Sequence, residues 1–259
     1  MALTGGEVLL DRSGDGRVAY LTLSHGRYTV ITWEMRRLVA ERFAELDRDP
    51  DVRVVVLRSD GEHFTSGGDI AGFMEVDPID FTDLGHNITA PGRSPKPVIA
   101  AVDGYCFGVG CELALSCDIR LGTPRTRFAL PEMNLGMIPG SGGTQRLARL
   151  IGLSRAKFHI MTATRIPAQQ ALDWGILAEL HADRDALNTA VDALAAKLAD
   201  FSPAAQRTAK EVLDRGVDAP LATGIELERK AYAMLRATDD FAEGVAAFTQ
   251  KRAPKFTGR

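Results

Sequence analysis

Cysteine is scarce in this sequence of 259 residues, which contains only Cys106, Cys111 and Cys117. Three cysteines crowded into residues 106–117 without a CxxC pair argue against a disulfide framework. The N-terminal residues lack an apolar leader segment, and no apolar run approaches the roughly 20 residues that span a bilayer. The sequence therefore predicts a protein of a reducing compartment, most simply the cytoplasm, without a membrane partner.

The sequence also lacks a strong excess of charge of either sign. Its net charge is −3, its pI is about 6.0 and its basic residues are scattered, so we expect no nucleic-acid partner. It has no GxxxxGK[ST] motif, no GxGxxG that opens a helix after a strand, and no GxSxG. The five histidines have no metal-ligand spacing, so we expect no metal site.

Strand and helix patterns alternate through the first part of the chain. Apolar and β-branched runs predict strands at 18–23, 52–59 and 97–104, and helical spacing of apolar residues predicts a helix over 34–49. This alternation is typical of an α/β core. After residue 182 only helical patterns remain, so we divide the chain into a core over 1–182 and a helical region over 183–259. The apolar faces of that region must pack on the core or on a neighbouring subunit.

Two glycine-rich turns follow predicted strands, HFTSGGDI at 63–70 and GYCFGVGCELA at 104–114. A turn that enters a helix leaves backbone N–H groups without acceptors inside the helix. Two such turns after neighbouring strands can direct two N–H groups at one oxygen. That is the geometry of an oxyanion hole for an acyl group.

Two glutamates lie among apolar and small residues near these turns. Glu112 is just inside the second turn, and Glu132 follows 20 positions later. Two carboxylates that face one water can serve as base and acid, and burial would raise their pKa values toward neutrality. A glutamate in a glycine-rich turn is more often a capping or structural acid, so the residues alone leave both interpretations open.

Four segments together resemble the crotonase superfamily, and its enoyl-CoA hydratases most closely: FTSGGDI, GYCFGVGCELALSCDIRL, FALPEMNLGMIPGSGGTQRL and the ending FTQKRAPKF. They follow the family's order over nearly the whole chain. The resemblance implies an α/β fold, a crotonase-like spiral of ββα units, with the C-terminal helical region used in trimer formation and trimers often paired into hexamers. It also implies an acyl-CoA substrate, with coenzyme A carried as part of that substrate and no separate cofactor.

The resemblance implies that water adds across the 2,3 double bond of a 2-enoyl-CoA. By motif position, the N–H groups of Gly68 and Val109 form the oxyanion hole, and Val109 stands where the family often has glycine. In the same comparison Glu112 activates the water, Glu132 supplies the proton at C2, and the backbone of Gly140 supports the Glu132 side of the site.

The resemblance also implies which residues contact the substrate. The predicted CoA contacts are Arg27, Gly67, Asp69, Ile70, Phe248 and Lys251. The last two commonly act across a subunit boundary, and their alternatives are a packing aromatic and a solvated lysine. The acyl-pocket candidates, each with core packing as its alternative, are Phe73, Met74, Phe81 and Leu84. One departure is SHGRYTVITWEM at 24–35, which lacks the asparagine–alanine pair of the RPxxxNAL-like segment along the CoA path.

Three functions remain open at this stage. Because both glutamates are present, hydration is favoured over the isomerases and dehalogenases of the superfamily, which tend to lack one of the pair. Hydrolysis of an acyl-CoA, or hydrolytic C–C cleavage, would use the same hole and the same water-activating acid. A scaffold protein with a degenerate site is the third alternative, and the intact glutamates and turns argue against it.

Overall fold

A computed structural model describes residues 3–75 and 80–258, without the side chains of residues 74, 80–82 and 84. A six-stranded sheet lies at its centre, in the order β1-β2-β3-β4-β6-β9. Its strands are β1 (Glu7–Arg12), β2 (Val18–Ser24), β3 (Val54–Ser59), β4 (Val98–Val102), β6 (Ile119–Gly122) and β9 (Glu179–Leu180). β1 and β2 pair antiparallel, and the pairs that follow across the sheet are parallel. β2, β3 and β4 confirm the strands predicted at 18–23, 52–59 and 97–104.

A smaller sheet continues from the end of β4. Its order is β5-β7-β8, with strands β5 (Tyr105–Phe107), β7 (Arg127–Ala129) and β8 (Ile166–Pro167). A parallel bridge joins Cys106 of β5 to Thr65, which lies in the segment after β3. The segments that leave the carboxyl ends of β3 and β4 therefore run side by side. This edge of a parallel sheet is where α/β proteins bind ligands.

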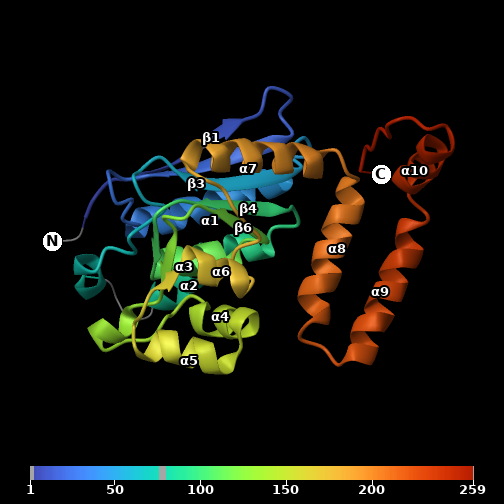
Figure 1. Cartoon of the computed structure of the whole chain (residues 1–259). Helices are drawn as coiled ribbons and strands as arrows, with labels where there is room; N and C mark the ends of the chain where they lie inside the picture. The colour runs from blue at the N-terminus through green and yellow to red at the C-terminus, as the bar shows by residue number, and fades with distance from the viewer. Residues whose placement is uncertain (1–2, 76–79, 259) are drawn as a thin grey trace.

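Helices cover both faces of the central sheet (Figure 1). The α-helices are α1 (Trp33–Arg48), α2 (Asp80–Ile88), α3 (Val109–Ser116), α4 (Gly143–Ile151), α5 (Leu153–Met161), α6 (Ala168–Asp173), α7 (Arg184–Ala199), α8 (Pro203–Gly216), α9 (Leu221–Leu235) and α10 (Asp239–Thr249). Short 3₁₀ turns are η1 (Ala71–Met74), η2 (Ala90–Arg93) and η3 (Glu132–Leu135). α1 confirms the helix predicted over 34–49, and Thr32 caps its first turn by accepting from the N–H of Met35.

The alternation of side chains along β3 separates two hydrophobic cores. Val54 and Val56 pack with α7 in one cluster, whereas Val55 and Leu57 belong to the cluster that contains the buried face of α1. Successive strand residues point to opposite faces of a sheet, so α7 and α1 lie on opposite sides of it. The predicted α/β core is thereby confirmed as a sheet of mostly parallel strands between helical layers.

Helices α8, α9 and α10 stand away from the sheet (Figure 1). α8 and α9 pack on each other, and Lys210 of α8 donates hydrogen bonds to the Asp118 carboxylate at 2.8 Å and to two carbonyl oxygens of the core. The exposed apolar side chains of α9 and α10 are Leu221, Ile225, Tyr232, Met234, Phe241, Val245 and Phe248. The helices expected after residue 182 are confirmed. The division of the chain at that residue stays a prediction, because α7 packs on the sheet.

Among the helices within residues 3–75 and 80–258, none combines the length and the apolar character of a membrane span.

Candidate active site

The two glycine-rich turns meet at the carboxyl edge of the central sheet. The N–H of Thr65 donates to the carbonyl oxygen of Tyr105 at 2.8 Å, and the N–H of Phe107 donates back to Thr65 at 3.2 Å. Gly67 and Gly108 have φ angles of +117° and +53°, which favour glycine. A methyl group added to Gly108 would lie 4.0 Å from the Cα of Gly67, so the backbones approach closely. The residues that follow these two glycines are therefore neighbours in space.

Gly68 and Val109 are those neighbours. A methyl group added to Gly68 would lie 3.4 Å from Cγ1 of Val109. In the described part of the chain, neither backbone N–H donates a hydrogen bond to the protein. Val109 is the first residue of α3, so its N–H lies at the positive end of the helix dipole and has no acceptor within the helix. Two such donors fit an oxygen that becomes negatively charged.

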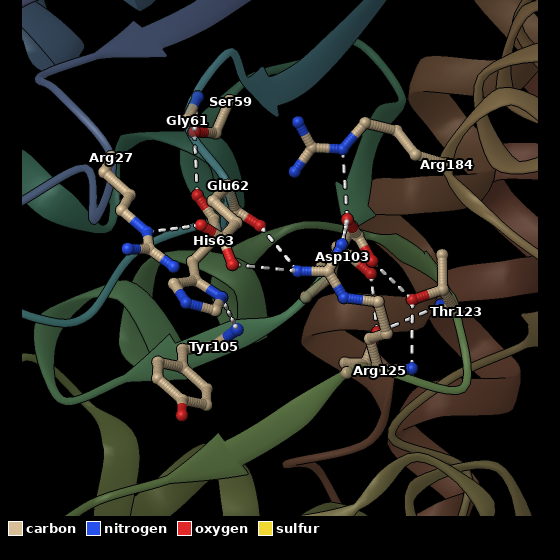
Figure 2. A network of polar contacts seen from close by, with 12 residues as sticks. Arg27, Ser59, Gly61, Glu62, His63, Asp103, Tyr105, Thr123, Arg125 and Arg184 are labelled. Carbon is tan, nitrogen blue, oxygen red and sulfur yellow. Dashed lines mark hydrogen bonds and ion pairs between the residues drawn. The ribbon is translucent and has the colours of Figure 1, made fainter.

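Asp103, the residue that follows β4, holds the start of the second turn in place (Figure 2). Its carboxylate accepts hydrogen bonds from Oγ1 of Thr123 at 2.6 Å, from Arg184 at 3.0 Å and from Arg125 at 3.3 Å. Asp103 is buried, so these charge-assisted bonds compensate for the desolvation of its carboxylate. The network connects α7 to the strand that leads into the turn.

Glu112 lies in the first turn of α3 and is 3% exposed. Its Oε1 accepts hydrogen bonds from the N–H groups of Ser141 at 2.6 Å and Gly143 at 3.0 Å. Burial raises the pKa of Glu112, whereas these two hydrogen bonds and the charge of Arg36 act in the opposite direction. The bonds fix the orientation of the carboxyl group and support its charged form inside the protein.

Glu132 is the first residue of η3, and it lies in the wall of the same cavity as Glu112. A methyl group added to Gly108 would lie 3.2 Å from Oε1 of Glu132, whereas Oε2 of Glu132 is buried and has no hydrogen-bond partner among the described residues. Burial, with a smaller contribution from the charge of Glu112, raises the pKa of Glu132 to about 7. A carboxyl group with this pKa can give or take a proton near neutral pH.

A cavity of about 330 Å³ connects the two turns and the two glutamates. The predicted residues in its wall are Gly67, Gly68, Ile70, Phe73, Val109, Glu112, Glu132 and Gly140. Gly140 lies where an added methyl group would meet no other atom within 4 Å, so its backbone borders open space. Within residues 3–75 and 80–258, no three His, Cys, Asp or Glu side chains form a group that could hold a metal ion.

Sequence reasoning missed one charged residue of the cavity wall, Arg36 of α1. It is 5% exposed and lies on the buried side of the helix, three residues before Val39 and seven before Phe43. A cation at an apolar position of a helical pattern was the available signal. Met137 and Ile138, which follow η3, also line the cavity and add apolar surface.

Arg27 and Asp69, two of the four predicted CoA contacts that lie outside the cavity wall, are held by other partners. The guanidinium of Arg27 pairs with the carboxylate of Glu62, whose carbonyl oxygen also accepts from Arg125 at 3.2 Å (Figure 2). Oδ2 of Asp69 accepts a hydrogen bond from the N–H of Leu3 at 2.6 Å, although both neighbours of Asp69 line the cavity. The roles expected for Arg27 and Asp69 in CoA binding stay predictions.

The remaining predicted residues fall into two groups. Phe248 of α10 is 87% exposed, and Lys251 follows the same helix, so both lie in the C-terminal helical region and outside the cavity wall. Met74 lies in η1, and Phe81 and Leu84 lie in α2, but their side chains are outside the described residues. Of the four acyl-pocket candidates, the structure places Phe73 at the cavity.

Comparisons with known proteins agree with this site. The sequence profile of the family described as Enoyl-CoA hydratase/isomerase matches residues 14–259. The chain is 39% identical over 213 residues to the 2,3-dehydroadipyl-CoA hydratase of Escherichia coli strain K12. The aligned region covers 82% of this chain and 83% of that protein. It is 34% identical over 251 residues to the short-chain-enoyl-CoA hydratase of Clostridium acetobutylicum, with 95% of each chain covered.

A solved structure extends the agreement to the fold. The crystal structure of enoyl-CoA hydratase from Bacillus anthracis superposes with a TM-score of 0.91 at 32% sequence identity, covering 97% of this chain and 99% of that one. The α/β architecture is therefore shared over nearly the whole length of both chains. These matches over almost the full length confirm the resemblance drawn from four short segments. This chain belongs to the enoyl-CoA hydratase/isomerase family of the crotonase superfamily.

Proposed function

We propose that this protein adds water across the 2,3 double bond of a 2-enoyl-CoA thioester and so acts as an enoyl-CoA hydratase. One observation carries the proposal: two backbone N–H groups without acceptors and two carboxyl groups, those of Glu112 and Glu132, border one cavity. Relatives that are named as hydratases and are 34–39% identical over most of the chain support the same activity.

The N–H groups of Gly68 and Val109 bind the thioester carbonyl oxygen in this proposal. When water attacks C3, negative charge moves through C2 to that oxygen and an enolate forms. Donors fixed in the backbone stabilise the enolate without reorganising, and one such donor is worth about 10²–10³ in kcat. Valine at position 109 keeps the backbone donor and so keeps this function.

Glu112 and Glu132 transfer the protons. Glu112, oriented by the N–H groups of Ser141 and Gly143, takes a proton from the water as its oxygen bonds to C3. Glu132, whose pKa of about 7 leaves much of it protonated at neutral pH, gives a proton to C2. The C2–C3 bond becomes single and the thioester stays intact. Proton exchange with solvent then returns Glu112 and Glu132 to their starting states.

The C-terminal helices, in this proposal, join copies of the chain into a trimer or a hexamer. The apolar side chains that α9 and α10 expose need such a cover. Phe248 and Lys251 would then contact the CoA bound to a neighbouring copy, which accounts for their position outside the cavity of their own chain. The cytoplasm remains the proposed compartment, and the three buried cysteines, all free thiols, suit reducing conditions.

A substrate panel tests the proposed function. Purified protein is incubated with 2-enoyl-CoA thioesters of increasing chain length, and the products are weighed by mass spectrometry while a thiol reagent detects free CoA. Hydration yields a thioester heavier by one water and no free thiol. Release of free CoA would instead identify a hydrolase, a shifted double bond without a mass change would identify an isomerase, and no product from any thioester would contradict enzyme activity of this class.

A further inference from the structure

Arg36 is a buried cation in the wall of the active-site cavity, beside Glu112. Within residues 3–75 and 80–258, its guanidinium forms no ion pair, and its Nε has no hydrogen-bond partner although it is buried. A charge removed from water without a hydrogen-bonded partner costs several kcal/mol. A cation in this state at a binding cavity indicates that its partner arrives with the ligand.

Among the described residues, the groups around Arg36 supply only part of the compensation that its charge needs. The rings of Trp33 and Phe73 lie 5.1 and 5.7 Å from the guanidinium carbon, and such cation–π contacts offset only part of the desolvation. Burial lowers the pKa of Arg36 to about 10, so the side chain is still charged at neutral pH. Glu112 already accepts two backbone hydrogen bonds, from Ser141 and Gly143, and does not depend on Arg36 for its orientation.

Apart from its electrostatic effect on Glu112, Arg36 takes no part in the proposed hydration step. The thioester oxygen takes the N–H groups of Gly68 and Val109, and the water takes the two glutamates. A methyl group added to Gly68 would lie 2.8 Å from Nη2 of Arg36, so the guanidinium sits against the turn that binds the carbonyl. An acyl group that extends from this carbonyl into the cavity therefore passes close to the guanidinium of Arg36.

We propose that Arg36 binds a carboxylate on the acyl group of the substrate, which makes this protein selective for the CoA thioester of an unsaturated dicarboxylic acid. The inference rests on the proposed hydratase function and adds the acyl class. A guanidinium presents two parallel N–H donors to a carboxylate, a match that a neutral acyl tail does not make. When the acyl carboxylate enters the cavity, its pairing with Arg36 replaces the hydration that each charge loses.

The test uses two pairs of acyl-CoA molecules with equal chain length. Hex-2-enoyl-CoA and hex-2-enedioyl-CoA report turnover, and hexanoyl-CoA and adipoyl-CoA report binding without a reaction. For the wild-type protein we expect a higher kcat/KM and a lower Kd for the carboxylate-bearing member of each pair. Arg36→Met should reduce this preference by about 30-fold or more, mainly through KM and Kd. Arg36→Lys, which keeps the charge without the planar fork, should retain part of it.

Arg37→Met is the matched control, because Arg37 is exposed on the same helix and pairs with Glu41. This variant should keep the wild-type preference, and circular dichroism with thermal melting shows whether each variant is folded. The proposal is overturned if the wild-type protein does not prefer the carboxylate, or if Arg36→Met lowers kcat for both substrates alike, because Arg36 then acts through Glu112.

The same measurements distinguish a failure of the Arg36 carboxylate site from a failure of the hydratase function. Hydration of hex-2-enoyl-CoA without any preference for the carboxylate would retain the hydratase function and remove the role of Arg36. Binding of adipoyl-CoA that depends on Arg36, without hydration of either enoyl-CoA, would retain the carboxylate site and remove the hydratase function.

Discussion

Glu112 and Glu132 border one cavity in contrasting surroundings. Glu112 belongs to a fully buried helix and accepts two backbone hydrogen bonds, whereas Glu132 begins a short turn and has a buried oxygen that finds no partner in the described part of the chain. Burial raises the pKa of both, but only Glu112 has hydrogen bonds to backbone N–H groups from another segment that oppose the shift. The difference shows how two identical side chains acquire different protonation at one pH, which is what a base and an acid require.

Replacing either glutamate by glutamine should have the largest effect on kcat. Glu112→Gln and Glu132→Gln each remove a proton-transfer group, so we expect kcat for crotonyl-CoA to fall about 10³-fold. Steady-state kinetics measures the loss, and Glu41→Gln on the exposed face of α1 is the control. Wild-type kcat in either variant would remove that glutamate from the mechanism.

A substitution beside Glu112 tests whether the fixed orientation of its carboxyl group is needed for catalysis. A methyl group at Gly143 would lie 3.0 Å from Cγ and Oε1 of Glu112 and 3.0 Å from Cδ1 of Leu130, so Gly143→Ala must shift the Glu112 side chain against a packed wall. We expect kcat to fall about 10- to 100-fold, because small misplacements of reacting groups are costly. Gly14→Ala is the control, since a methyl group there meets nothing within 4 Å. Unchanged kcat in Gly143→Ala would show that Glu112 need not be held rigidly.

The pKa of Glu132 predicts the pH dependence of the reaction. If Glu132 donates a proton, kcat/KM must fall as the pH rises through about 7, where the acid ionises. The pH profile of kcat/KM for hydration measures this limb. A rate that instead rises through the same pH would assign Glu132 as the base.

The same pKa predicts a smaller effect on stability. Because folding raises the pKa of Glu132 from 4.5 to about 7, its contribution to the free energy of unfolding is fully present below about 4.5 and is lost as the pH rises through about 7. Urea unfolding of the wild-type protein and Glu132→Gln at several pH values measures it. The variant should show the weaker loss of stability over this window, and equal pH dependence in both proteins would contradict the raised pKa.

Local patterns were enough to predict three strands of the central sheet and the two glycine-rich turns, whereas the roles expected for both glutamates came from the resemblance to the crotonase superfamily and stay predictions. Gly67 and Gly108 mark positions of positive φ, and a short-range constraint of this kind is visible in the sequence. The helical pattern signals that Arg36 is buried but not that it lines the cavity, because its place there depends on how α1 packs against the segment after β3. For the same reason, the sequence did not reveal that Arg27 pairs with Glu62 and lies outside the cavity wall.

The sequence by itself determined the α/β class, the family and the chemical groups available for catalysis, because periodicity and short motifs reflect contacts between residues close in the chain. Only the tertiary structure decided which of these groups share one environment. The raised pKa of Glu132 and the lowered pKa of Arg36 both arise from burial, and burial depends on segments that are distant in sequence.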